Sequence, residues 1–92
     1  MTSMMAADPT SFPEESIHVD VAVASGPADR RAELETKFGD IRSFVGMARR
    51  TMLLDGCGIE KALAGIYPDA QRILVEIGHR PGVERIAVAF VL

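Results

Sequence analysis

Hydrophobic and polar residues alternate strictly in a short segment near the start of the chain. The branched apolar residues at positions 17, 19, 21 and 23 alternate with His18, Asp20 and two alanines. A period of two is typical of a strand with one buried face, so residues 17–24 are predicted to form a half-buried strand. Gly26 and Pro27 end this strand, and proline suits the first turn of a following helix.

Three helical segments are predicted after this strand. In the first, which begins at Pro27, Leu34 and Phe38 share one side, and Gly39 is expected to end the helix. Apolar residues at positions 41, 44, 45, 48 and 52 recur at helical spacing and predict a second helix capped by Asp40. The glycines at positions 56 and 58 interrupt the pattern, and residues 59–66 predict a short third helix.

The last part of the chain predicts a hairpin. Residues 73–77 fit either a helix or a strand, but their β-branched side chains and the turn residues at 78–82 favour a strand. The final segment, 84–92, is apolar on both faces, so its strand is expected at the centre of a sheet or between partners. The pattern as a whole predicts a small α+β domain. It consists of one strand, two to three helices and a C-terminal β-hairpin, with the helices on one face of a three-stranded sheet.

One segment resembles a known family. Residues 58–63 (Gly-Ile-Glu-Lys-Ala-Leu), followed by Pro-Asp-Ala at 68–70 and an apolar segment, are similar to the end of a NifU-type scaffold domain. The resemblance implies a strand at 73–77. That family depends on a paired-cysteine motif just before this helix, whereas Cys57 stands alone here, so the resemblance implies no cofactor.

Length and charge limit the chain to one domain with an acidic extension. The 92 residues carry a net charge of −3 and are 48% hydrophobic, which is typical of a globular protein. Residues 1–15 contain two prolines, three acidic residues and no basic ones, and predict a flexible acidic tail ahead of a single domain at 16–92. We find neither a targeting signal nor an apolar run long enough for a membrane helix, so a cytoplasmic location is expected.

Candidate catalytic and metal-binding residues are sparse. Cys57 stands between two glycines at the start of a helix, where a thiolate is favoured, and His18 or His79 would be its base. The alternative is a small residue packed in a tight turn, which a single cysteine without a local base favours. His18 and Asp20 would supply half of a metal site at most, so we expect no metal and no cofactor.

The basic residues of the second helix are the candidate partner-binding residues. Arg42, Arg49 and Arg50 fall mostly off its apolar stripe and would contact acidic groups of another protein. An alternative is a winged-helix-like DNA-binding regulator, in which the second and third helices pair and the hairpin forms the wing. The net negative charge and Glu60 at the start of the reading helix favour a protein partner.

The last strand predicts self-association. Residues 86–92 contain no charge, proline or glycine, and such a strand at a free edge invites aggregation. It lies either inside its own sheet or against a second chain, and we predict a homodimer whose interface includes Val88, Phe90 and Leu92. The expected function is a regulator, inhibitor or accessory subunit that acts by protein–protein binding. A DNA-binding regulator and a thiol-dependent enzyme that uses Cys57 are the alternatives.

Overall fold

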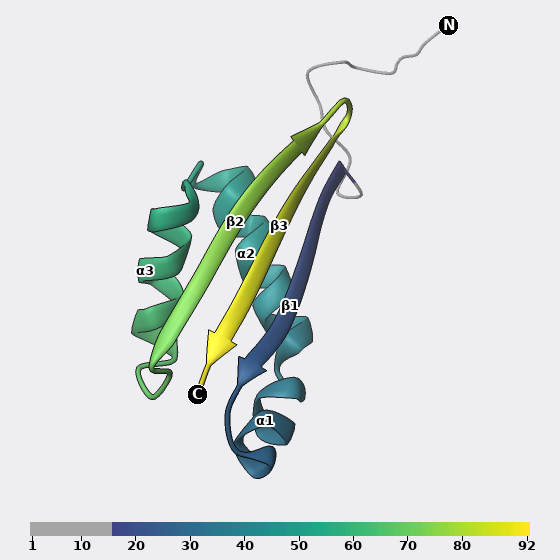
Figure 1. Cartoon of the computed structure of the whole chain (residues 1–92). Helices are drawn as coiled ribbons and strands as arrows, with labels where there is room; N and C mark the ends of the chain where they lie inside the picture. Colours follow the sequence, from purple (N-terminus) through teal and green to yellow (C-terminus); the bar gives the residue numbers. More distant parts are fainter. Residues whose placement is uncertain (1–15) are drawn as a thin grey trace, which may run out of the picture.

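The structure is a computed structural model that describes residues 16–92 (Figure 1). Its elements are β1 (Ile17–Ser25), α1 (Ala28–Glu35), α2 (Phe38–Thr51), α3 (Gly56–Ile66), β2 (Arg72–Arg80) and β3 (Val83–Val91). The predicted α+β fold is therefore confirmed, with one strand, three helices and a C-terminal hairpin. The predicted acidic tail, residues 1–15, lies outside the described residues.

The three strands form one sheet in the order β1-β3-β2, with β3 at the centre. β1 pairs with β3 in parallel, which requires the long helical connection between them, and β2 pairs with β3 as an antiparallel hairpin. Val88 of β3 lies between Val21 of β1 and Val75 of β2. The segment that fitted either helix or strand is thus a strand, and the doubly apolar last strand is central, as its pattern predicts.

The helices pack on one side of this sheet, which we call the covered face. In Figure 1 both α2 and α3 lie behind the strands; α2 contacts β1, and α3 contacts β2. The core between helices and sheet comprises Leu34, Ile41, Val45, Ala48, Ile59, Leu63, Ile73, Ile86, Val88 and Phe90. The other side of the sheet, which faces the viewer, has no helix on it in the described part of the chain, and we call it the open face.

Two of the three residues predicted to form a dimer interface are buried within the single chain. Val88 and Phe90 are 2% and 0% exposed because they point into the covered face, where the Tyr67 ring meets Phe90 edge-on at 5.6 Å. Leu92 is half-buried, and its N–H donates to the Ser25 carbonyl at 2.9 Å. Of the two solutions considered for this strand, the structure adopts the one inside its own sheet. Burial of Val88 and Phe90 therefore needs no second chain, and the dimer itself stays a prediction.

Three helix boundaries differ from the sequence prediction. The first helix ends at Glu35, where the Thr36 hydroxyl donates to the Glu33 carbonyl at 2.7 Å, and α2 already begins at Phe38. The third helix begins at Gly56, since the Asp55 carboxylate accepts from the Gly58 N–H at 2.8 Å and so caps its first turn. The glycines expected to break the helix are instead part of that turn.

Candidate functional site

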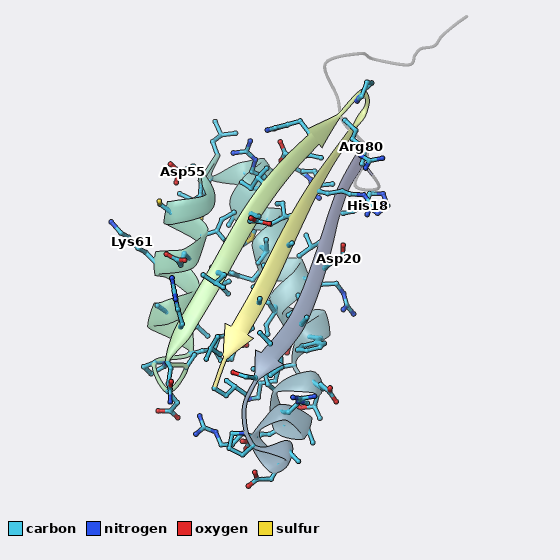
Figure 2. All side chains as sticks on the ribbon, in the orientation of Figure 1. His18, Asp20, Asp55, Lys61 and Arg80 are labelled. Carbon is cyan, nitrogen blue, oxygen red and sulfur yellow. The ribbon has the colours of Figure 1, made fainter. Side chains whose placement is uncertain are left out.

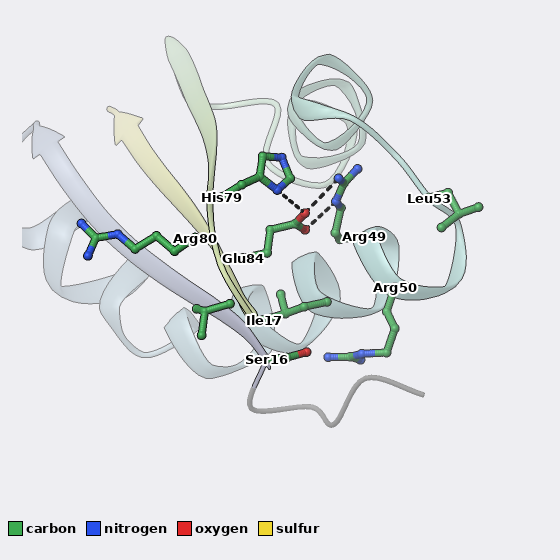
Figure 3. Close-up of a pocket in the computed structure, with 10 residues that line it drawn as sticks. Ser16, Ile17, Arg49, Arg50, Leu53, His79, Arg80 and Glu84 are labelled. Atoms are coloured by element: carbon green, nitrogen blue, oxygen red, sulfur yellow. Dashed lines mark hydrogen bonds and ion pairs between the residues drawn. The ribbon is translucent and has the colours of Figure 1, made fainter. Parts of the chain in front are cut away.

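A pocket of about 380 Å³ lies at the hairpin end of the sheet, beside the C-terminal end of α2 (Figure 3). Its lining combines apolar and charged side chains. It comprises Ser16, Ile17, Arg49, Arg50, Leu53, His79, Arg80, Gly82, Val83 and Glu84, and we call it the hairpin-end pocket. In Figure 3 the Arg80 guanidinium points away from the pair formed by Arg49 and Glu84. The charges that face the pocket therefore come from α2 and from the covered face of β2 and β3.

An ion pair between α2 and β3 forms one wall of this pocket. Arg49 donates from Nε to Glu84 Oε1 at 2.6 Å and from Nη2 to Oε2 at 3.0 Å. Its Nη1 also donates to the Leu54 carbonyl at 2.9 Å, which fixes the loop after α2. Such a two-pronged contact is the strongest geometry that arginine and a carboxylate offer. Arg49 is therefore held by the protein itself.

His79 completes this wall. It lies opposite Glu84 in the hairpin register, and its Nδ1 is 3.2 Å from Glu84 Oε2. The hydrogen bond from Arg49 lowers the pKa of Glu84 against the opposing effect of burial, and His79 adds a smaller lowering effect. The same hydrogen bond raises the pKa of Arg49. Both groups are consequently charged at neutral pH.

Leu53 marks the rim of the pocket. Among the described residues it is the one non-glycine with a positive φ, 55°, a conformation that costs about 1 kcal/mol in an L-residue. Its side chain is 77% exposed, although leucine favours burial. The helix end thus turns a large apolar side chain toward solvent beside Arg49 and Arg50. Strained residues of this kind cluster at binding sites.

A second, shallower depression continues from the pocket between α2 and β1. It is lined by Ile17, Val19, Arg42, Ser43, Gly46 and Arg50, and we call it the α2–β1 groove. It shares Ile17 and Arg50 with the hairpin-end pocket. Arg42 and Arg50 are exposed, and neither forms an ion pair with any residue in the described range 16–92.

The three predicted partner-binding arginines therefore separate into two groups. Arg42 and Arg50 lie along one groove and have no ion-pair partner in the described range, whereas Arg49 is paired with Glu84. Glu84 and Leu53 were missed as site residues. No local signal marks Glu84 as the partner of Arg49, because the two residues are 35 positions apart.

The structure does not assemble the predicted thiol site. Cys57 is exposed in the first turn of α3, which packs on the covered face beside β2. His18 lies on the open face of β1, at the opposite edge of the sheet, and Figure 2 shows it far from Asp55 at the start of α3. His79 is paired with Glu84. In the described part of the chain, neither histidine forms a hydrogen bond with Cys57.

Replacement of this cysteine tests the point. We expect Cys57→Ser to change the free energy of unfolding by less than about 1 kcal/mol, because the side chain is exposed and no described side chain bonds to it. Urea unfolding and the biological effect are the two measurements. Loss of the effect with unchanged unfolding would favour the thiol-dependent enzyme.

Replacement of Glu84 tests the ion pair. We expect Glu84→Gln to lower the free energy of unfolding by about 1–2 kcal/mol at pH 7, since it leaves Arg49 without its anion. A lowered pKa stabilises the fold above the ordinary pKa of glutamate and loses that effect as the pH falls. The difference from wild type in urea unfolding should therefore shrink as the pH falls below the ordinary pKa of glutamate. Glu33→Gln, at an exposed position on α1, is the control, and equal behaviour of both variants would contradict the prediction.

Neither the geometry of the described residues nor comparison with known proteins assigns this chain to a known class. Among residues 16–92, no group of three or more His, Cys, Asp or Glu side chains is arranged to hold a metal ion. No described helix has the length and apolar character needed to cross a lipid bilayer. No family model matches the sequence, and neither a curated protein nor a solved structure matches it with statistical significance.

Proposed function

We propose that the protein acts by binding an acidic, extended segment of another protein in the α2–β1 groove, as a regulator, inhibitor or accessory subunit. The observation that carries this proposal is the pair Arg42 and Arg50, two exposed arginines without described anionic partners along one groove. Charged rows of this kind steer association and select partners of opposite charge. The cytoplasmic location expected from the sequence is part of this proposal.

The spacing of the two arginines suits an extended ligand. They are eight residues apart in α2, which separates them by about 12 Å along the helix axis. In an extended chain, side chains four residues apart lie on the same face and about 13 Å from each other. A partner segment with carboxylates at positions i and i+4 would therefore place one on Arg42 and the other on Arg50.

The neighbouring strand offers backbone groups to the same ligand. β1 is an edge strand of nine residues, and it pairs only with β3 in the described part of the chain. It contains neither proline nor lysine, which natural edge strands use to discourage pairing. An extended segment that adds to this edge would gain main-chain hydrogen bonds, while the arginines would select its acidic side chains.

A labelled peptide tests the proposal. We expect a ten-residue peptide that alternates glutamate and threonine to bind wild type, and Arg42→Glu with Arg50→Glu to weaken binding at least about tenfold. The control variant, Arg31→Glu with Lys61→Glu, changes the net charge equally on exposed positions outside the groove; Lys61 projects away from the sheet (Figure 2). Fluorescence anisotropy measures peptide binding by wild type and by each variant. A peptide that alternates lysine and threonine should not bind.

Several outcomes would contradict this function. Equal losses in the groove variant and the control variant would show that only net charge matters. Binding to a random DNA duplex with steep salt dependence, without binding to the acidic peptide, would favour a nucleic acid ligand. The fold gives that alternative little support, because the β2–β3 hairpin is part of the sheet beneath α2 and α3 and does not stand beside them as a wing.

A further inference from the structure

The open face of the sheet carries an ordered pattern of charge across its three strands. Residues that lie side by side in the strand register form rows. Three successive rows are Asp20, Ala87 and Glu76 (the acidic row); Ala22, Ala89 and Leu74 (the apolar row); and Ser25, Val91 and Arg72 (the basic row). A further row, His18, Arg85 and Gly78, lies beyond the acidic row. The apolar row is therefore flanked by negative charge on one side and by positive charge on the other.

Two opposite charges of this face have no ion-pair partner in the part of the chain that the structure describes. Glu76 and Arg72 are exposed, and neither forms an ion pair with another residue of the described range. They lie four residues apart on β2, about 13 Å, which is too far for them to pair with each other. Between them, Leu74 is 40% exposed although it sits in the middle of a strand.

We infer that this open face binds a second copy of the chain, face to face, about a two-fold axis that crosses the strands at the apolar row. Rotation about that axis reverses the strand direction and places each strand over its own copy. Leu74 then meets the partner's Leu74, and Ala89 meets the partner's Ala89. Glu76 lies opposite the partner's Arg72, and the two-fold axis repeats this ion pair.

The charges select this arrangement over its neighbours. An axis through the acidic row would place Glu76 on the partner's Glu76 and Asp20 on the partner's Asp20. An axis parallel to the strands would place Asp20 on the partner's Glu76. Both create like-charge contacts, which disfavour association. An axis through the row of His18, Arg85 and Gly78 would place Arg85 on the partner's Arg85. Of these axes, the one at the apolar row places Glu76 opposite a positive charge without a like-charge contact.

The size of the face predicts a weak dimer. Three strands are about 14 Å wide, and the three rows extend about 20 Å along them, so the overlap is on the order of 300 Å² per chain. A standard stable interface buries about 800 Å² per partner. We therefore expect a dimer dissociation constant of about 100 µM, which is typical of weak, transient complexes.

Charge exchange tests the geometry. Sedimentation of wild type from about 5 to about 500 µM should show the mean mass rising toward that of two chains. Glu76→Arg and Arg72→Glu should each weaken association at least about tenfold, because each creates a like-charge contact with the partner. The double exchange should restore association. An equimolar mixture of the two single variants should also associate, since each supplies the charge that the other lacks.

Two results would overturn the inference. Wild type that stays monomeric throughout the range would remove the interface. A double variant as weak as the single ones would move any self-association away from this face. Circular dichroism of each variant keeps folding separate from association, and both positions are exposed. Because Arg72 and Glu76 lie on the face opposite α2, their substitution leaves the α2–β1 groove intact. The dimer and the proposed function are therefore tested independently.

Discussion

Replacement of Phe90 with alanine should remove about 3–5 kcal/mol from the free energy of unfolding, measured by urea titration at low protein concentration. Phe90 is fully buried at the centre of the core, where it packs below the helices and meets the edge of Tyr67. Loss of the ring leaves a cavity that the rigid sheet fills poorly. A domain of this size has about 5–15 kcal/mol in total, so this single substitution should remove a large fraction of its stability.

A neighbouring strand position provides the matched control. Leu74 pairs with Ala89, the residue before Phe90 in β3, and it lies on the open face, where it is 40% exposed. Leu74→Ala should therefore cost less than about 1 kcal/mol at the same protein concentration. If Leu74→Ala proved as costly as Phe90→Ala, the assignment of the two sheet faces would be wrong. If Phe90→Ala is too unstable to titrate, Phe90→Leu should still unfold at a lower urea concentration than Leu74→Ala.

The sequence was informative about the strands because their patterns are local. Alternation in β1 reports which side chains face the helices, and the doubly apolar β3 reports a central position. What local pattern does not contain is the pairing itself. Val21, Val88 and Val75 become neighbours only when three distant segments align. Local pattern therefore leaves open whether the same chain or a second chain covers the apolar face of β3; in the structure, helices of the same chain cover it.

The same limit explains the candidate site. The arginines of α2 are visible as residues off the apolar stripe, so Arg42, Arg49 and Arg50 could be named from the sequence. The sequence does not indicate which of these arginines is available to a partner, because Glu84 pairs with Arg49 only in the tertiary fold. Leu53 was also hidden, since Met-Leu-Leu at 52–54 continues an apolar helical pattern and nothing in it predicts a positive φ. Helix ends depend on such local details more than on hydrophobic period.

The two proposed surfaces can be occupied at the same time. The α2–β1 groove lies along the helix side of the β1 edge, whereas the open face lies on the other side of the sheet. Two chains that associate through their open faces would leave both grooves accessible. A partner with two acidic segments would then bind such a dimer more tightly than a monomer, through the gain that comes from linked sites.

Replacement of Gly26 should have the second-largest effect on stability. Gly26 connects β1 to α1 with φ 153°, a conformation that L-residues with side chains rarely adopt. A Cβ atom at this position would lie 2.6 Å from the Leu92 Cβ, which is closer than any real contact of this kind. The Leu92 backbone cannot simply withdraw, because its N–H is bonded to the Ser25 carbonyl. We therefore expect Gly26→Ala to cost about 2–3 kcal/mol.

A second glycine shows that the effect comes from this position rather than from the type of substitution. Gly65 lies in α3, and a Cβ built there meets no atom within 4 Å. Gly65→Ala should stabilise the protein by about 0.5–1 kcal/mol, since alanine favours helix over the unfolded chain. Thermal and urea unfolding of the two variants should thus shift in opposite directions from wild type. A Gly26→Ala variant as stable as wild type would show that the β1–α1 connection and Leu92 are not packed as the structure has them.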